Sequence, residues 1–190
     1  MRRLTRTCWG LVMTGALAGA ASGQAPRRGQ LVDLAAHPEV RREIKVTSDQ
    51  EPRLNEVVSQ LKTKKVRHLE ARAEIAKVLK PDQVQRLDQV RLQVLDGLAL
   101  DDPEVVKTLG LDAERMHRLD EARKVNAVEE DKMADVMKRA RFRSAEDRNA
   151  FIAKYHKAAG ERLAAVLSDE QKAKFREMKG RAIDKVEALP

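Results

Sequence analysis

The chain has 190 residues, of which 36% are charged and 3% are aromatic, and its formal net charge is +8. A β-sandwich needs more aromatic residues than this, and the apolar positions are filled mostly by Ala, Leu and Val, which suit amphipathic helices. We therefore predict an all-α fold with essentially no strand, in one domain or two small ones.

Residues 1–23 have the pattern of a secretory signal peptide. Three arginines precede an apolar run of 13 residues, Trp9 to Ala21, and Ala21-Ser22-Gly23 is typical of a cleavage site. The run is shorter than the roughly 20 residues that span a membrane. We therefore expect export to the periplasm or the medium, with no transmembrane segment in the mature chain.

Removal of the leader would lower the net charge from +8 to +5, because it takes three arginines and no acids. Acidic residues alternate with the remaining basic ones, so we expect no nucleic-acid partner. The sole cysteine, Cys8, lies in the leader, and a disulfide is therefore not expected in the mature protein. Residues 24–30 resemble a flexible tail.

The chain contains an internal repeat. Residues 38–57 recur in degenerate form at 103–122, with a constant offset of 65. The identical pairs are Pro38/Pro103, Glu39/Glu104, Val40/Val105, Arg53/Arg118, Leu54/Leu119 and Glu56/Glu121. A second similarity relates residues 78–90 to 166–178. The repeat predicts a first helical half over 31–100 and a second over 101–190.

In the first half, Pro38, Val40 and Ile44 predict a short helix. An apolar stripe then predicts one long helix from about Pro52 to Leu79, interrupted by the polar residues 62–65. Lys80-Pro81 begins another helix, which should end near Gly97.

In the second half, Asp101-Asp102-Pro103 is a strong helix-start signal. A long, weakly apolar stripe follows from 111 to 140, and Ser144 is placed to cap the next helix. The terminal helix should carry Phe175, Met178, Ala182 and Val186 on one face. We expect helical hairpins or an elongated, coiled-coil-like bundle.

Similar helix starts recur in both halves. Each has an apolar residue, then Thr, Lys or Ser, then Gln three positions later, a spacing that lets the Gln side chain cap the preceding amide. A fourth start keeps the leucine but has Arg115 in place of the glutamine. The residues concerned are Val46, Thr47, Gln50, Leu79, Gln83, Leu111, Leu167, Ser168 and Gln171.

These starts resemble the LTxxQ motif of the Spy/CpxP-like extracytoplasmic proteins. The resemblance implies a small, exported, all-helical protein that acts as an ATP-independent chaperone, an envelope-stress factor or a metal sensor. Chaperones of that family form cradle-shaped dimers, so the resemblance also implies a homodimer. This chain differs in having four starts in tandem, where the family typically has two, and Thr at only one of them.

Catalytic residues are not evident. His37, His68, His117 and His156 are scattered, and the sequence contains neither a metalloprotease motif nor a phosphate-binding loop. We therefore predict a non-enzymatic protein without a cofactor and assign no metal ligands. A metal-sensing module remains an alternative, for which the nearest ligands are His117 with Asp120 or Glu121, and His156 beside Tyr155.

Two basic runs are candidates for contact with other proteins. They could attract acidic or unfolded polypeptides, or they could be solvated helix faces. The candidate contact residues are Lys62, Lys64, Lys65, Arg139, Arg141, Phe142 and Arg143. The leading hypothesis is a chaperone or stress factor that binds unfolded or partner proteins. A structural envelope protein is a further alternative.

Overall fold

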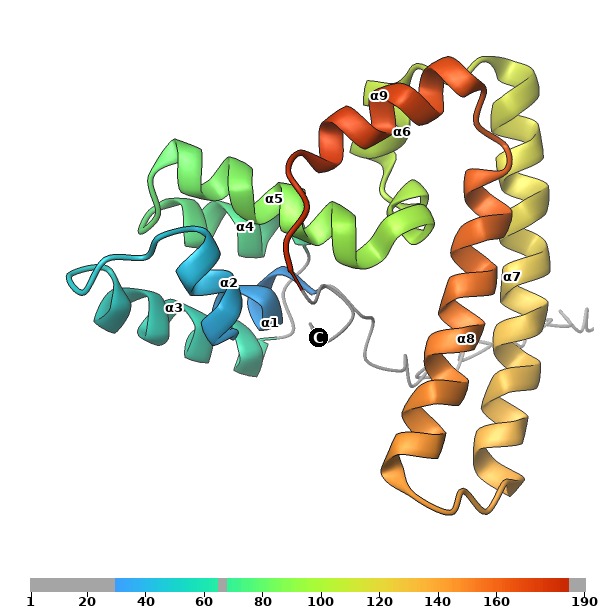
Figure 1. Ribbon diagram of the computed structural model, residues 1–190, viewed down its shortest axis with the longest axis horizontal. Helices are drawn as coiled ribbons and strands as arrows, with labels where there is room; N and C mark the ends of the chain where they lie inside the picture. Colours follow the sequence, from blue (N-terminus) through green and yellow to red (C-terminus); the bar gives the residue numbers. More distant parts are fainter. Residues whose placement is uncertain (1–29, 65–67, 185–190) are drawn as a thin grey trace, which may run out of the picture.

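The computed structural model describes residues 30–64 and 68–184, and within these ranges it contains helices and loops but no strand, which confirms the all-α prediction (Figure 1). The helices are α1 (Leu31–Ala36), α2 (Pro38–Glu43), α3 (Glu51–Lys64), α4 (His68–Ala76), α5 (Pro81–Leu95), the 3-10 helix η1 (Asp96–Asp101), α6 (Pro103–Leu109), α7 (Ala113–Arg139), α8 (Ala145–Ala164) and α9 (Asp169–Lys179). None of these helices is both long and apolar enough to cross a membrane.

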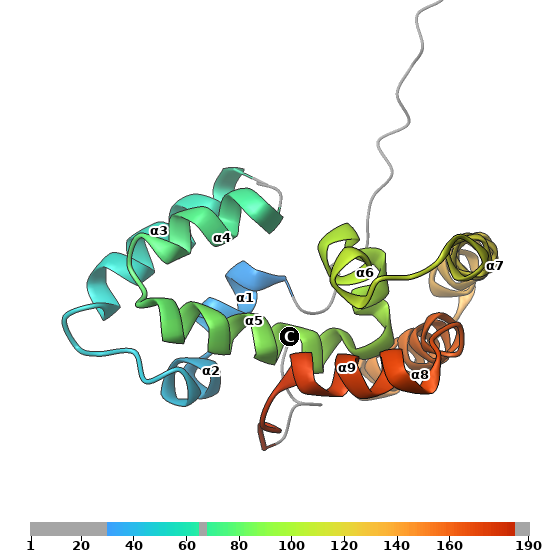
Figure 2. The ribbon, with the colours of Figure 1, turned by 90° about the horizontal axis from the view of Figure 1, so that it is seen from above.

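Helices α1 to α5 enclose a first hydrophobic cluster (Figure 2). Its fully buried side chains come from every one of these helices and include Leu34, Val40, Leu54, Ile75 and Leu87. The helix α1 was not predicted. It forms because Leu31, Val32, Leu34 and Ala35 can all be buried against α3 and α5.

The prediction of one long helix over 52–79 is wrong. The chain reverses direction between α3 and α4, so that the start of α3 lies beside the end of α4 (Figure 2). The side-chain amide of Gln50 consequently donates to the carbonyl of Val78 at 3.0 Å. The reversal buries Leu61 and Ile75 in the same cluster, whereas Leu69, which the sequence stripe places with them, is 62% exposed.

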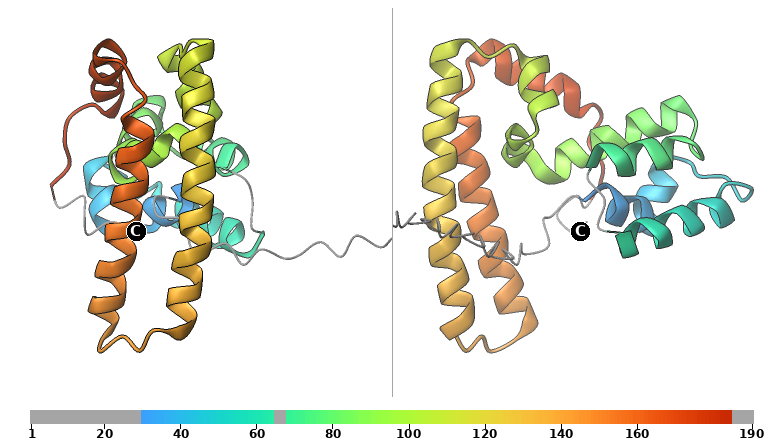
Figure 3. Two further views of the ribbon diagram at one scale, coloured as in Figure 1. Left: turned by 90° about the vertical axis from the view of Figure 1, so that its right-hand side faces the viewer. Right: turned by 180° about the vertical axis from the view of Figure 1, so that it is seen from behind.

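A second cluster contains the end of α5, η1, α6 and α9, together with the parts of α7 and α8 nearest to them. Leu100, Leu119 and Leu163 are fully buried in it. The hairpin of α7 and α8 extends far beyond this cluster (Figures 1 and 3). We refer to its outer part, residues 125–158, as the distal arm.

The predicted terminal helix is shorter than expected. It ends at Lys179, because Gly180 has a φ of 62°, which a helix cannot continue through. Ala182 is therefore exposed and outside the helix, and Val186 lies outside the described residues. The helix α5 similarly ends at Leu95, so Gly97 belongs to η1.

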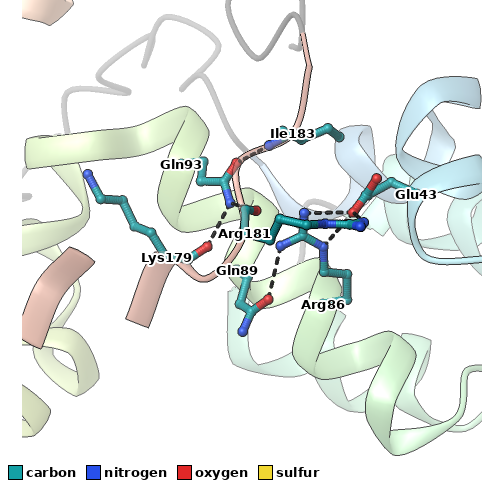
Figure 4. A network of polar contacts seen from close by, with 7 residues as sticks. All are labelled: Glu43, Arg86, Gln89, Gln93, Lys179, Arg181 and Ile183. Carbon is teal, nitrogen blue, oxygen red and sulfur yellow. Dashed lines mark hydrogen bonds and ion pairs between the residues drawn. The ribbon is translucent and has the colours of Figure 1, made fainter. Parts of the chain in front are cut away.

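The segment after α9 returns to the first half and is held by a polar network (Figure 4). The Gln93 amide donates to the carbonyls of Lys179 and Arg181 at 2.6 and 2.7 Å and accepts from the Ile183 amide at 2.9 Å. Glu43 of α2 accepts from both Arg86 and Arg181. Burial acts to raise the pKa of Glu43, but these two guanidinium groups outweigh it and lower the pKa.

A backbone contact between two glycines joins η1 to α8. A Cβ atom at Gly97 would overlap the carbonyl oxygen of Gly160, and a Cβ atom at Gly160 would lie 3.3 Å from the Leu98 amide nitrogen. Both glycines are buried. The close approach therefore requires residues without a side chain at both positions, and most strictly at position 97.

We expect Gly97→Ala to lower the free energy of unfolding by about 2–3 kcal/mol, because two backbones must separate. Gly110→Ala is a suitable comparison: Gly110 has a φ of 67° and no atom near its added Cβ, so only the left-handed conformation is penalised, by about 1 kcal/mol. Denaturant unfolding followed by circular dichroism measures both. Equal losses would contradict the role assigned to the glycine contact.

Candidate functional site

The first two helix starts contact one another through their glutamines. Gln50 Nε2 donates to Gln83 Oε1 at 2.8 Å, and Gln83 Nε2 donates to Gln50 Oε1 at 3.0 Å. Each oxygen also accepts from the amide three residues earlier in its own chain segment, Thr47 N at 3.1 Å and Lys80 N at 2.8 Å. The sequence predicted the capping but not the pairing.

Each glutamine also donates to a backbone carbonyl of the opposite motif. Gln50 Nε2 reaches Val78 O at 3.0 Å, and Gln83 Nε2 reaches Lys45 O at 2.8 Å. Each of these carbonyls belongs to the residue five positions before the glutamine of its own motif: Val78 before Gln83, and Lys45 before Gln50. A primary amide has two donor hydrogens and two acceptor lone pairs, and these contacts occupy all of them. Gln83 can therefore be buried to 5% exposure without an unsatisfied polar atom.

The other two starts face one another in the same way, but only part of the network is present. Gln171 caps Ser168 N at 3.0 Å and donates to Gly110 O at 3.4 Å, a carbonyl five residues before Arg115. Arg115 occupies the place of the fourth glutamine. Its Nη1 atom contacts Asp112 at 2.6 Å, while its Nε is buried without a partner among the described residues.

The backbone around the paired starts repeats as well. Lys45 ends α2 with a φ of 56°, and Gly110, 65 residues later, ends α6 with a φ of 67°. Each half then continues through a hairpin to a closing helix, α5 or α9. The offset between equivalent glutamines is 88 residues for Gln83 and Gln171, because the second hairpin is longer.

The remaining motif residues support these contacts. Leu79 and Leu167 are buried, and Val46 and Leu111 are half-buried against the clusters. Ser168 accepts from Gln171 N at 3.2 Å, which completes the predicted capping box. Thr47 is exposed, and its backbone carbonyl accepts from Gln50 N at 3.0 Å.

The structure does not bring the two basic runs together. Lys62 lies at the end of α3, 3.5 Å from Asp33, whereas Arg139, Arg141, Phe142 and Arg143 form the tip of the α7–α8 hairpin (Figure 1). Lys65 and the side chain of Lys64 fall outside what the structure describes. The sequence suggested that both runs line one basic groove. The described residues of the two runs do not form such a groove.

Sequence reasoning missed an exposed apolar line on the outer face of α7. Val125, Val128 and Val136 are 46, 54 and 43% exposed, and their spacing places them on one side of the helix. Lys132 lies between them on the same side. The predicted stripe for this helix placed Val136 with Leu119 and Met133. Those two residues are buried, whereas Val136 is not.

Among the side chains that the structure describes, which do not include that of His68, the histidines do not gather into a metal site. Within the described ranges, no group of three or more His, Cys, Asp or Glu side chains is placed to hold a metal ion. His117 does lie near Glu121. The pKa of the Glu121 carboxyl is lowered mainly by a hydrogen bond from Lys124 and to a smaller extent by His117.

We expect Gln83→Ala to reduce the free energy of unfolding by about 3 kcal/mol, because it removes four hydrogen bonds and leaves buried partners unsatisfied. Gln171→Ala is the matched control and should cost about 1 kcal/mol, since Gln171 makes one cap and one long contact. The two values come from denaturant titrations. A loss for Gln171→Ala as large as that for Gln83→Ala would argue against the paired network.

Arg115→Gln should stabilise the protein by about 1 kcal/mol, because the new amide could exchange reciprocal hydrogen bonds with Gln171, as Gln50 and Gln83 do, which completes the network of the second half. The lost ion pair with Asp112 is exposed and should cost little. Thermal unfolding tests this. The gain should disappear in the Arg115→Gln/Gln171→Ala double variant, and a gain that persists there would have another origin.

Comparison with known proteins adds no further assignment, since no family model, curated protein or solved structure matches this chain.

Proposed function

We propose that the protein is an exported, non-enzymatic chaperone or envelope-stress factor that binds unfolded or partly folded polypeptides. The observation that carries the proposal is the outer face of α7, where three valines remain exposed on a helix that is otherwise rich in charge. Exposed apolar residues that gather on one face are typical of a protein-interaction surface. The predicted signal peptide supports the extracytoplasmic location.

The distal arm suits this role because its outer face has few core contacts to make. Of the α7 residues beyond Ala122, only Met133 is buried. Asn126 holds the two helices together from within, since its carbonyl accepts from the Tyr155 hydroxyl at 3.0 Å and its side chain contacts Arg162 and the Ala159 carbonyl. The valines on the opposite face can therefore be covered by a client without any change in the fold.

Charge would contribute to capture. The basic residues at the hairpin tip would increase the encounter rate with acidic segments, and the valines would hold the client after contact. Binding of this kind is adaptable, because it requires an apolar line and a charge of one sign but no specific sequence. That breadth is what a chaperone for varied clients requires.

The double variant Val125→Ser/Val128→Ser should weaken protection of an aggregating client, such as reduced α-lactalbumin or heated citrate synthase. Each covered valine contributes on the order of 1 kcal/mol, so the concentration giving half-protection should rise about tenfold or more. Light scattering during aggregation is the measurement.

Leu69→Ser provides the control, because Leu69 is also an exposed apolar residue but lies on the first hairpin. It should leave protection unchanged. Added salt should weaken the wild-type protein if the basic tip contributes. Absence of any suppression by the wild-type chain at stoichiometric concentration would reject the chaperone function.

A further inference from the structure

Basic charge is concentrated at the ends of the two hairpins. From residue 30 onward the chain has 33 basic and 30 acidic residues. The runs 62–67 and 138–143, between α3 and α4 and between α7 and α8, contain eight of the basic residues and no acidic one. The rest of this part of the chain therefore has 25 basic against 30 acidic residues, so the basic excess comes from these two runs.

The second of these ends is fully described and continues into α8. Residues 138–160 contain seven basic residues and only two acidic ones. Arg139, Arg141, Arg148 and Lys154 are exposed, and their side chains make no ion pair with any residue in the described part of the chain. By contrast, residues 113–137 of α7 include five basic and seven acidic residues. The distal arm thus has a basic tip.

Aromatic residues accompany the basic ones. Of the four aromatic side chains after residue 29, only Phe175 lies elsewhere, in the second cluster, while Phe142, Phe151 and Tyr155 lie in this segment. Phe142 is at the tip between Arg141 and Arg143, half-buried against Phe151 with ring centroids 5.7 Å apart. An aromatic ring among arginines at a projecting end is well suited to the interface of a lipid bilayer.

We propose that the tip of the α7–α8 hairpin docks the protein on the surface of an anionic phospholipid bilayer. The arm projects beyond the rest of the molecule (Figure 3), so the tip can contact a flat surface while the helices of the two hydrophobic clusters stay at a distance from it. Phosphate groups would pair with the free arginines, and Phe142 would enter the headgroup region. This function is separate from the retention of a client after contact, which uses the valines of α7.

A flat anionic surface fits these observations better than a soluble acidic chain does. An acidic segment lying along the arm would meet the carboxylates of α7, among them Glu129, Asp131 and Asp135. A bilayer would contact the tip without covering that flank. Attraction of this kind amounts to roughly 1 kcal/mol for each basic residue near the surface and decreases with salt.

The test uses the chain from residue 24 onward, which retains every described helix and lacks the apolar leader. Cosedimentation compares vesicles of phosphatidylcholine alone with vesicles that also contain phosphatidylglycerol. We expect binding only to the anionic vesicles, and about a tenfold or greater loss for Arg139→Gln/Arg141→Gln. The matched control, Lys174→Gln/Arg176→Gln on α9, removes the same charge from exposed positions that pair with no described acidic residue, and it should bind normally.

A fluorescent probe locates the contact. Trp9 is the sole tryptophan of the chain and lies in the leader, so Phe142→Trp gives a single reporter at the tip. Its emission should shift to shorter wavelength on anionic vesicles, whereas Leu69→Trp on the first hairpin should not respond. Circular dichroism confirms that each variant is folded.

The proposal is overturned by equal binding to neutral and anionic vesicles, by an equal loss in the α9 control, or by a silent Phe142→Trp reporter. Binding of polyglutamate, heparin or an oligonucleotide through the tip, without vesicle binding, would instead assign the tip to a soluble polyanion. Because no client is present in these experiments, their failure would leave client protection by the α7 valines intact, and failure of client protection would leave vesicle binding intact.

Discussion

The fold of the first half depends on the reciprocal amide pair between Gln50 and Gln83. The pair fixes the loop before α3 to the loop before α5, and in doing so it holds both ends of the α3–α4 hairpin in place. Every donor and acceptor of the two amides is used. The hydrogen bonds therefore offset the cost of removing the pair from water at the edge of a hydrophobic cluster. The short helix α2 and the closing helix α5 are thereby brought into contact.

The second half uses the same arrangement with one partner changed. Arg115 cannot make the reciprocal amide contacts, and its guanidinium instead pairs with Asp112 in its own helix start. The weaker network coincides with the longer hairpin, whose base is held by other means: the backbone contact of Gly97 with Gly160 and the burial of Leu119 and Leu163. The repeated backbone geometry supports the duplication inferred from the sequence.

The halves are not independent bodies. Leu92 of α5 belongs to the second cluster, while Val84, Leu87 and Val90 of the same helix belong to the first. Ile183, from the end of the described chain, packs against the first cluster, and Arg181 pairs with Glu43. The helix α5 therefore transmits packing between the two clusters, and the sequence boundary near residue 100 does not separate two cores. The distal arm is outside both and is the part freest to present a surface.

The sequence by itself determined the all-α class, the caps at Asp102, Ser144 and Ser168, and the repeat of helix starts, because capping and 3.6-residue periodicity are local properties. It did not determine the reversal between α3 and α4, since an apolar stripe looks the same on one long helix as on two antiparallel ones. Nor did it reveal the glutamine pair, the glycine contact or the exposed valines of α7. These arise where segments far apart in the chain meet, or fail to meet, and only the tertiary structure decides which face of a helix finds a partner.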